Sequence, residues 1–278
     1  MEDLQKHISE LQEKIEKLEV TAKFYEYQYE EEKAKVKELK KMRAQYPYAY
    51  KYPHPAVATD CVIFGFEKKG LKVLLVERGG EPYKGCWALP GGFLKMAGGY
   101  RETLEECARR ELLEETGCAN ADLIDQLQVF SEVDRDPRER VISVAFYALV
   151  QMSEVKGGDD AANARWFSFD EVPERLAFDH QQILAAAKAK LKEQIHFQPV
   201  GFDLLPEVFT MSELQKLYEA ILEVHFDRRN FYKKIHSLGI LDVAVQRPEG
   251  TTTRTPIKYR FNKEVYDAFK QKGFRLEF

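Results

Sequence analysis

The stretch that most constrains this chain is an acidic segment, RELLEETG, at residues 110–117. Its carboxylates Glu111, Glu114 and Glu115 are spaced i, i+3 and i+4, so on an α-helix they share one face. Apolar residues take the opposite face: Leu104, Cys107, Ala108, Leu112 and Leu113. The pattern predicts an amphipathic helix that packs its apolar side on a core and ends at Gly117, a residue suited to the left-handed conformation.

Three like charges on one helix face repel each other and need a counter-charge. A divalent cation such as Mg²⁺ supplies it, because Mg²⁺ prefers carboxylate oxygens and accepts substrate phosphates at its remaining positions. Arg110 lies four residues before Glu114 and is expected to hold that carboxylate from the same face. The alternative is a solvated acidic face without a ligand, which is the common role of such a pattern taken alone.

The residues around the acidic segment resemble the Nudix box, Gly-x5-Glu-x7-Arg-Glu-U-x-Glu-Glu-x-Gly-U, where U is aliphatic. Residues 87–92 (WALPGG) precede it and predict a strand end running into a glycine-rich loop. The x7 spacing back from Arg110 reaches Glu102, as the pattern requires. The glycine of the pattern would fall on Met96, whereas the last glycine of the pair is Gly92. The loop before Glu102 is therefore four residues longer than the pattern, with nine residues in place of five.

This resemblance implies a Nudix α/β/α sandwich with a mixed sheet and a Mg²⁺ or Mn²⁺ cofactor. It implies that Glu111, Glu114 and Glu115 bind the metal, that Arg110 orients them and that Glu102 supports the site. In an enzyme of this kind the metal polarises a phosphoryl oxygen and helps to generate the attacking hydroxide. The longer loop counts against full catalytic efficiency, because it changes the segment just before Glu102.

Candidate ligand contacts come from the loops around the box. Arg78 follows the strand expected at 71–77, which pairs with one at 57–66; it reaches a substrate phosphate or lies at the surface beside a turn. Gly91 and Gly92 belong to the glycine-rich loop. The run RDPRxRVIS, with Arg135 and Arg138, lies between strands expected at 123–130 and 141–151. This run resembles the ADP-ribose-pyrophosphatase branch of the family, and the alternative is a solvated charged hairpin.

A WF…P…AFDH segment closes this domain, as in the same relatives, and leads into a helix expected from His180 to about Gln194. His180 alone is expected to cap or pack that helix and not to catalyse.

The N-terminal 44 residues are predicted to form one helix with a heptad repeat. One seam position holds Ile8, Ile15, Ala22, Tyr29 and Val36, and the other holds Leu4, Leu11, Leu18, Tyr25 and Leu39. Glu32 breaks the alternating spacing. Ile at the first position and Leu at the second favour a parallel two-stranded coiled coil. The alternative is a single helix packed on its own protein, but the strict period of seven favours self-association.

The C-terminal part predicts a winged helix-turn-helix. Thr210 and Glu213 form a capping box before a helix at 212–223, Asp227 caps a second helix, and 240–245 pairs with 257–261. From residue 228 onward there are twelve Lys or Arg and five Asp or Glu, a net charge of about +7, which suits DNA phosphates. The candidate DNA contacts are Arg228, Arg229, Asn230, Lys233, Lys234, Arg254 and Lys258. The alternative is a protein-interaction wing.

The predicted organisation is a coiled-coil helix at 1–44, a Tyr/Pro-rich linker at 45–56, a Nudix domain at 57–198 and a winged helix at 205–278. With the motifs FTxxELQxLYEAI and DxRNFxKK, this order resembles the Nudix-related transcriptional regulators of bacteria. The resemblance covers roughly residues 54–275 and implies an α/β protein that binds operator DNA as a homodimer and senses a ligand in its Nudix domain. The N-terminal heptads lie outside the family pattern.

Two classes of function remain open. The first is a DNA-binding regulator whose Nudix domain binds an ADP-ribose-like nucleoside diphosphate derivative with Mg²⁺, with hydrolysis of that ligand left open; a sugar-binding, non-catalytic regulator is a variant of it. The second is a Nudix pyrophosphohydrolase with an accessory C-terminal domain that does not bind DNA. The basic helix and wing favour the first, and the complete set of box glutamates favours the second.

Composition places the protein in the cytoplasm. The chain has 278 residues, room for about two domains, and a net charge of −4 that averages over segments of opposite sign. The four cysteines are far apart and form no CxxC pair, which favours a reducing compartment over a disulfide framework or a zinc site. The charged N-terminus does not fit a signal peptide, and no apolar run reaches membrane-spanning length.

Overall fold

The structure is a computed structural model that describes residues 2–45, 51–67, 70–96, 101–116, 123–152, 164–197, 204–245 and 256–272. It consists of two compact units, Met1–His54 and Pro55–Phe278, and each is considered by itself. No helix within the described ranges combines the length and the apolar character needed to span a bilayer.

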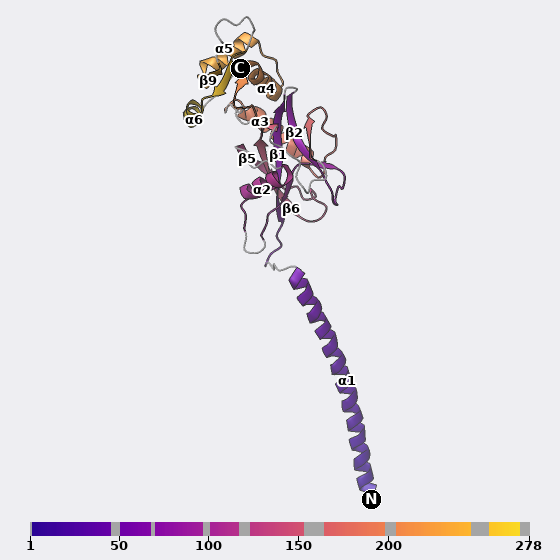
Figure 1. Cartoon of the computed structure of the whole chain (residues 1–278). Coiled ribbons are helices and arrows are strands. Elements are labelled where there is room, and N and C mark those ends of the chain that lie inside the picture. Colours follow the sequence, from indigo (N-terminus) through magenta and orange to yellow (C-terminus); the bar gives the residue numbers. More distant parts are fainter. Residues whose placement is uncertain are drawn as a thin grey trace. The chain divides into compact units, whose positions relative to one another are not determined.

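The first unit contains α1 (Glu2–Gln45), a single helix of 44 residues (Figure 1). Its heptad residues are solvent-exposed; Leu4 and Leu18, for example, are 70% and 68% exposed. Ion pairs along the helix, such as Lys17 Nζ to Glu13 Oε1 at 2.7 Å, add the usual small stabilisation of i, i+4 pairs. The predicted long helix is confirmed, while its pairing with a second copy remains a prediction.

The second unit is built on a mixed sheet, which among the described residues has seven strands in the order β3-β2-β1-β6-β5, with β4 paired to β1 and β7 to β2. The strands are β1 (Ala56–Glu67), β2 (Gly70–Glu77), β3 (Trp87–Ala88), β4 (Gly91–Phe93), β5 (Leu123–Phe130), β6 (Val141–Leu149) and β7 (Ala164–Ser168). Strands β1 and β6 run parallel at the centre, and the other pairs are antiparallel.

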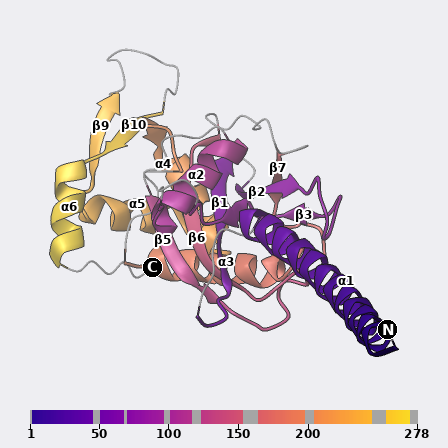
Figure 2. The same ribbon diagram turned by 90° about the horizontal axis from the view of Figure 1, so that it is seen from below.

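Two helices cover opposite faces of this sheet: α2 (Leu104–Thr116) and α3 (His180–Gln194) (Figure 2). Alternate residues of a strand point to opposite faces. In β1, Cys61 and Ile63 accordingly pack in the core under α2, whereas Val62 and Phe64 pack in the core under α3. The predicted Nudix-type α/β/α sandwich with a mixed sheet is confirmed.

Two local predictions in this region need correction. Residues 91–93 form strand β4, paired to β1, and not a loop. Leu113 does not belong to the packed face of α2: it is 48% exposed, while its neighbour Leu112 is buried, because successive helical residues point about 100° apart. The predicted helix end at Gly117 lies outside the described residues.

The C-terminal part has three helices in the described ranges, α4 (Met211–Leu222), α5 (Arg228–Ser237) and α6 (Lys263–Lys272). A small antiparallel sheet accompanies them, in the order β8 (Phe209–Thr210), β10 (Lys258–Phe261) and β9 (Leu241–Val245). The capping box of Thr210 and Glu213 forms as predicted, and Asp227 caps α5 through the amides of Arg229 and Asn230. The winged helix is confirmed, with β8 and α6 as elements that the sequence interpretation lacked.

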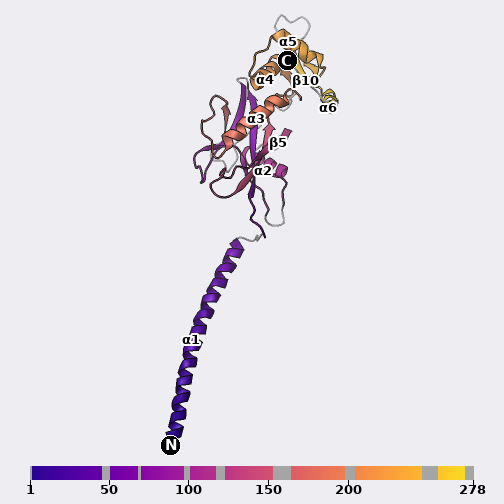
Figure 3. The same cartoon turned by 180° about the vertical axis from the view of Figure 1, so that it is seen from behind.

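The winged helix packs directly on the Nudix sandwich. The core under α3 continues into α4 and α5, so that Leu184 and Leu191 of α3 belong to the same hydrophobic cluster as Leu217, Ile221 and Phe231. Helices α3 and α4 lie side by side (Figure 3). A covalently adjacent but loosely tethered DNA-binding domain would not share a core in this way.

Candidate functional site

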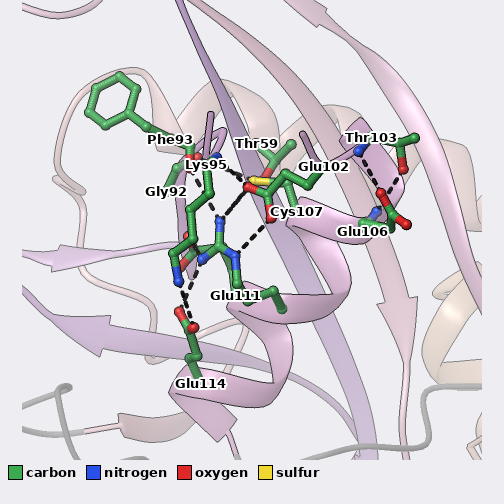
Figure 4. Close-up of polar contacts among 11 residues, drawn as sticks. Thr59, Gly92, Phe93, Lys95, Glu102, Thr103, Glu106, Cys107, Glu111 and Glu114 are labelled. Atoms are coloured by element: carbon green, nitrogen blue, oxygen red, sulfur yellow. Dashed lines mark hydrogen bonds and ion pairs between the residues drawn. The ribbon is translucent and has the colours of Figure 1, made fainter. Parts of the chain in front are cut away.

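Arg110 of α2 organises the acidic helix. Its guanidinium binds both carboxylate oxygens of Glu102, with Nε to Oε2 at 2.9 Å and Nη2 to Oε1 at 2.7 Å. Nη1 also donates to Glu111 at 2.6 Å and to Glu114 at 3.0 Å, and these contacts converge in Figure 4. Hydrogen bonding to Arg110 holds the pKa of Glu102 at about 2, although burial opposes that shift. Arg110 therefore holds Glu102, Glu111 and Glu114 together, and its role in orienting metal ligands stays a prediction.

The longer loop of the box is closed by Glu102 and Lys95. The Lys95 amide donates to Glu102 Oε1 at 2.6 Å, and the Glu102 amide lies 3.5 Å from the Lys95 carbonyl. The Lys95 ammonium also reaches Glu114 Oε1 at 2.9 Å (Figure 4). Because Lys95 and Glu102 bracket the added residues, Glu102 keeps its place on Arg110 despite the insertion.

Gly91 and Gly92 permit close contact between β4, to which they belong, and its neighbours. A Cβ on Gly92 would lie 2.1 Å from Glu111 Oε1, and one on Gly91 would lie 2.3 Å from the Thr59 carbonyl oxygen. Real Cβ atoms do not approach so closely, so any larger residue displaces Glu111 or the β1 backbone. The requirement for glycine here is steric, since neither residue needs a left-handed backbone.

Glu115 is the least satisfied carboxylate of the helix. Its Oε2 is buried and has no hydrogen-bond partner among the described residues. Burial, and then the charge of Glu111, raises the pKa of Glu115 to about 8. Glu111 is also buried, and burial raises its pKa. A divalent cation relieves both effects at once, so Glu111 and Glu115 fit a metal site.

Glu114, the third predicted ligand, is turned to Lys95 and Arg110. No three His, Cys, Asp or Glu side chains in the described part of the chain are grouped so that they could hold a metal ion.

A cavity of about 210 Å³ lies beside this helix and brings together residues from distant parts of the sequence. The five predicted ligand contacts Arg78, Gly91, Gly92, Arg135 and Arg138 all line it. Arg78 and Gly91 also line a neighbouring cavity of about 150 Å³ that includes Glu115. Three guanidiniums thus face a space that adjoins the acidic helix, which is an arrangement suited to a diphosphate.

The floor of the cavity is a buried ion-pair network around Arg135. Its guanidinium donates to Asp179 at 2.6 and 2.9 Å and to Asp60 at 3.1 Å. Burial would raise the pKa of Asp60, but His180, Ser143 and Arg135 together lower it to about 2. Arg135 is predicted to contact a ligand. Its side chain is only 4% exposed, and its guanidinium is already hydrogen-bonded to the two aspartates of the cavity floor.

His180 and Phe178 line the cavity as well and were not chosen as site residues from the sequence. His180 packs as predicted: its Nδ1 accepts from the Leu89 amide at 2.8 Å, and its Nε2 lies 3.3 Å from Asp60 Oδ1. The Phe178 ring lies under the guanidiniums of Arg78 and Arg138, at 4.8 and 5.5 Å from the ring centre. In the sequence, only the AFDH motif draws attention to Phe178 and His180. The motif does not predict which residues they contact.

The second candidate site is the outer face of α5. Arg228, Arg229, Asn230 and Lys233 are exposed, Lys234 is half-buried, and Lys258 is exposed on β10. Phe231 and Ile235 are buried, as their spacing predicts. The Tyr232 and Tyr259 hydroxyls lie 3.4 Å apart and join α5 to β10. Arg254, the predicted contact at the wing tip, lies outside the described residues.

Comparisons with known proteins match both parts of the chain. Residues 54–187 match the NUDIX domain, and residues 201–261 match the NrtR DNA-binding winged helix domain. The ADPR responsive transcriptional repressor NtrR of Acinetobacter baylyi is 30% identical over 213 residues, which cover 76% of this chain and 84% of that protein. The ADP-ribose pyrophosphatase of Methanocaldococcus jannaschii is 45% identical over 129 residues, 46% of this chain and 70% of that protein.

The fold also matches a solved regulator. The crystal structure of Shewanella oneidensis NrtR complexed with a 27mer DNA has a TM-score of 0.67 and 27% sequence identity, with 79% of this chain and 97% of that chain covered. A MutT/nudix family protein from Enterococcus faecalis has a TM-score of 0.63 and 28% identity, with coverage of 81% and 93%. The chain therefore belongs to the NrtR-like family of Nudix-related transcriptional regulators, in which a NUDIX domain is joined to a DNA-binding winged helix.

Proposed function

We propose that this protein is a transcriptional repressor that binds operator DNA through its winged helix and ADP-ribose, or a similar nucleoside diphosphate derivative, in its Nudix cavity. One observation carries the proposal: an arginine-lined cavity and an exposed basic helix belong to one unit with a shared core. The names of the Acinetobacter and Methanocaldococcus relatives support ADP-ribose as the ligand, and the DNA complex of the Shewanella relative supports DNA.

The cavity suits such a ligand chemically. Arg78 and Arg138 offer planar guanidiniums that match phosphate oxygens, and both stack on the Phe178 ring, which limits their freedom. Gly92 keeps β4 close to Glu111, and Gly91 keeps it close to β1, so that the ligand phosphates would approach the acidic helix.

Mg²⁺ or Mn²⁺ at Glu111 and Glu115 completes this site. These two carboxylates would hold the metal, which would supply positive charge to the diphosphate. Arg110, itself held by Glu102, would keep Glu111 in place, and Glu114 would have to leave Lys95 to become a third ligand. Hydrolysis of the diphosphate is the second candidate function, favoured by the buried, unpartnered Glu115 Oε2.

On DNA, the start of α5 would lie in the major groove. Arg228, Arg229 and Lys233 are placed to neutralise phosphates or reach base edges, Asn230 to pair with adenine, and Lys258 to hold the wing on the backbone. A homodimer would read a two-fold operator with half-sites about one helical turn, or a multiple of it, apart. Ligand binding would then release the DNA. As a member of a family of bacterial regulators, the protein would work in the cytoplasm, where the bacterial chromosome lies.

The helix α1 would pair with the same helix of a second copy. Its apolar stripe is exposed along its whole length, and Ile8, Ile15, Leu11 and Leu18 give the N-terminal half the residue types of a parallel dimer. Deletion of residues 1–44 should lower the mass of the assembly or weaken its association in multi-angle light scattering. An unchanged mass over a concentration series would show that the heptads do not pair.

The function is tested with promoter fragments from the protein's own gene neighbourhood. Fluorescence anisotropy should show at least one fragment bound more tightly than random DNA of equal length, and ADP-ribose should weaken that complex. ADP-ribose with Mg²⁺ is incubated in parallel and assayed for AMP. Product without DNA binding would favour the pyrophosphohydrolase with an accessory domain. DNA binding that responds to a pentose and not to ADP-ribose would favour the sugar-sensing regulator.

A further inference from the structure

Helix α3 joins the ligand cavity to the DNA-binding helices, and its first residues belong to the cavity. Asp179 occupies the N-cap position but makes no side-chain capping bond. Its carboxylate is instead bound to Arg135 at 2.6 and 2.9 Å. His180, the first residue of α3, is buried and held between the Leu89 amide and Asp60. The start of α3 is thus fixed by the cavity floor and not by its own cap.

Residue Phe178, just before the cap, is also tied to the cavity. It has a positive φ of 52°, an uncommon conformation for an aromatic residue, and its ring lies under Arg78 and Arg138. A phosphate that binds these guanidiniums must share them with Phe178, and one that binds Arg135 must share it with Asp179. Every anion that enters the cavity therefore changes the forces on residues 178–180.

The other end of α3 contacts the winged helix. Lys188 and Lys192 are one helical turn apart, and both ammonium groups bind the carboxylate of Glu223, Lys188 at 2.5 Å. Glu223 is the C-cap of α4, in the left-handed conformation with φ 56° and ψ 40°. Exposed ion pairs of this kind contribute little to stability. We therefore consider this contact for its position, because it joins the end of α3 to the end of α4.

The turn that follows Glu223 sets the position of α5. Glu219 accepts from the Phe226 amide at 2.9 Å, and Gln215 donates to the Phe226 carbonyl at 3.0 Å. Asp227 comes next and caps α5. Because these two bonds tie Phe226 to α4, a movement of α4 is passed through Phe226 and Asp227 to the N-terminus of the helix that carries Arg228 and Arg229.

We propose that α3 is the coupling element of this regulator: a ligand in the arginine-lined cavity moves the Phe178–His180 end of α3, and the Lys188/Lys192–Glu223 contact passes that movement to α4 and α5. This inference rests on the proposed function. The helix spans 15 residues, about 22 Å, and its buried side Ile183, Leu184, Ala187 and Leu191 packs in the continuous core. Close-packed cores move as units, so a displacement at one end reaches the other.

The test uses the full chain and the substitutions Glu223→Gln and Lys188→Gln/Lys192→Gln. The matched control is Lys190→Gln, which removes the Lys190–Glu193 pair on the same helix without touching α4. The measured quantity is the ratio of operator dissociation constants with and without saturating ADP-ribose, which by linkage is the coupling between the two ligands. We expect the two test variants to reduce this ratio about fivefold or more, and the control to keep the wild-type ratio.

Hydrogen exchange with and without ADP-ribose, in the absence of DNA, gives the second readout. In the wild type, ligand-induced changes should appear in both 178–194 and 211–237; in Glu223→Gln they should remain in 178–194 and disappear from 211–237. A merely stabilising contact would alter exchange with and without ligand equally. If Glu223→Gln unfolds, the swap Glu223→Lys with Lys188→Glu/Lys192→Glu should fold and restore the wild-type response.

The outcomes separate this inference from the proposed function. Test variants that keep the wild-type ratio and the exchange changes in 211–237 would overturn the coupling role of α3 and leave the repressor intact. A wild type that binds ADP-ribose but no promoter fragment would refute the repressor, while the exchange data would still decide on the coupling. A wild type that binds no ADP-ribose would refute both.

Discussion

The two charged regions of this protein are built in opposite ways. Around the Nudix cavity, most charges are wholly or partly buried and paired: Arg110 binds three glutamates, and Arg135 binds Asp60 and Asp179. On α5, the side chains of Arg228, Arg229 and Lys233 are exposed and form no ion pair with any residue that the structure describes.

The difference indicates different partners. A matched network fixes geometry to fractions of an ångström and suits a small ligand that must be distinguished from its analogues. An unmatched, solvated set of cations suits a polyanion, because its charges are available for phosphates at little desolvation cost. Substitutions in the first region should therefore affect folding and ligand specificity, whereas those in the second should affect DNA affinity alone.

The largest expected effect is on stability, from Arg135→Ala. Removing the guanidinium leaves Asp60 and Asp179 buried without their partner, which typically costs about 3–5 kcal/mol. Arg229→Ala, on the exposed helix, should change the free energy of unfolding by less than about 0.5 kcal/mol. Urea denaturation measures the free energy of unfolding of both variants. Similar losses of stability in the two variants would contradict the distinction between the regions.

Within the matched region, Glu115→Gln should separate metal binding from folding. Burial and the neighbouring Glu111 and Asp60 disfavour a negative charge at this site, and the neutral amide never carries one, so the metal-free fold should be retained or stabilised. Loss of a residue that supports a metal ligand typically costs ~10–100-fold in metal affinity, and loss of a ligand itself should cost at least as much. Mg²⁺ affinity should therefore fall by at least that factor, and metal-dependent turnover of ADP-ribose should fall as well. Calorimetric titration with Mg²⁺ measures this, and unchanged affinity would exclude Glu115 as a ligand.

The buried network also predicts an acid-dependent loss of stability. Asp60 has its pKa lowered to about 2 in the folded protein, against an ordinary value of 3.8. Such a group stabilises the fold above its unfolded pKa, and the contribution is lost as the pH falls toward 2; the expected size is about 2 kcal/mol. Asp60→Asn should flatten the curve of unfolding free energy between pH 5 and 2. A wild-type curve parallel to that of the variant would contradict the ion-pair assignment.

The same contrast explains what the sequence predicts well and what it does not. Local patterns predict local outcomes: the capping box at Thr210, the Asp227 cap, and the buried Phe231 and Ile235 follow from spacing within a few residues. The orientation of Glu102, Arg110 and Glu114 was also predictable, because one helix and a fixed motif hold them together.

The cavity floor was not predictable, because its partners come from distant strands and loops. Asp60 lies in the middle of an apolar strand, 75 residues before Arg135 and 120 before His180, and no spacing rule joins them. Leu113 was misplaced for a different reason: hydrophobicity alone does not decide which of two adjacent leucines faces the sheet. The pairing Lys188–Glu223 depends on the packing of two domains, which sequence periodicity does not encode.

The smallest expected free-energy change tests the unmatched region by its dependence on salt. The double substitution Arg229→Ala/Lys233→Ala removes two exposed cations from α5, so the slope of log affinity against log salt should fall by about two, one for each lost phosphate contact. At moderate salt this weakens DNA binding by roughly tenfold, while the unfolding free energy stays near that of the wild type. The matched control is Lys190→Gln, which removes a half-buried cation from α3 and not from α5; its slope should be unchanged. Anisotropy titrations from 50 to 300 mM KCl measure both. Full affinity and an unaltered slope in the double variant would mean that α5 does not meet the DNA backbone, and that exposed, unpaired cations on this helix serve another partner.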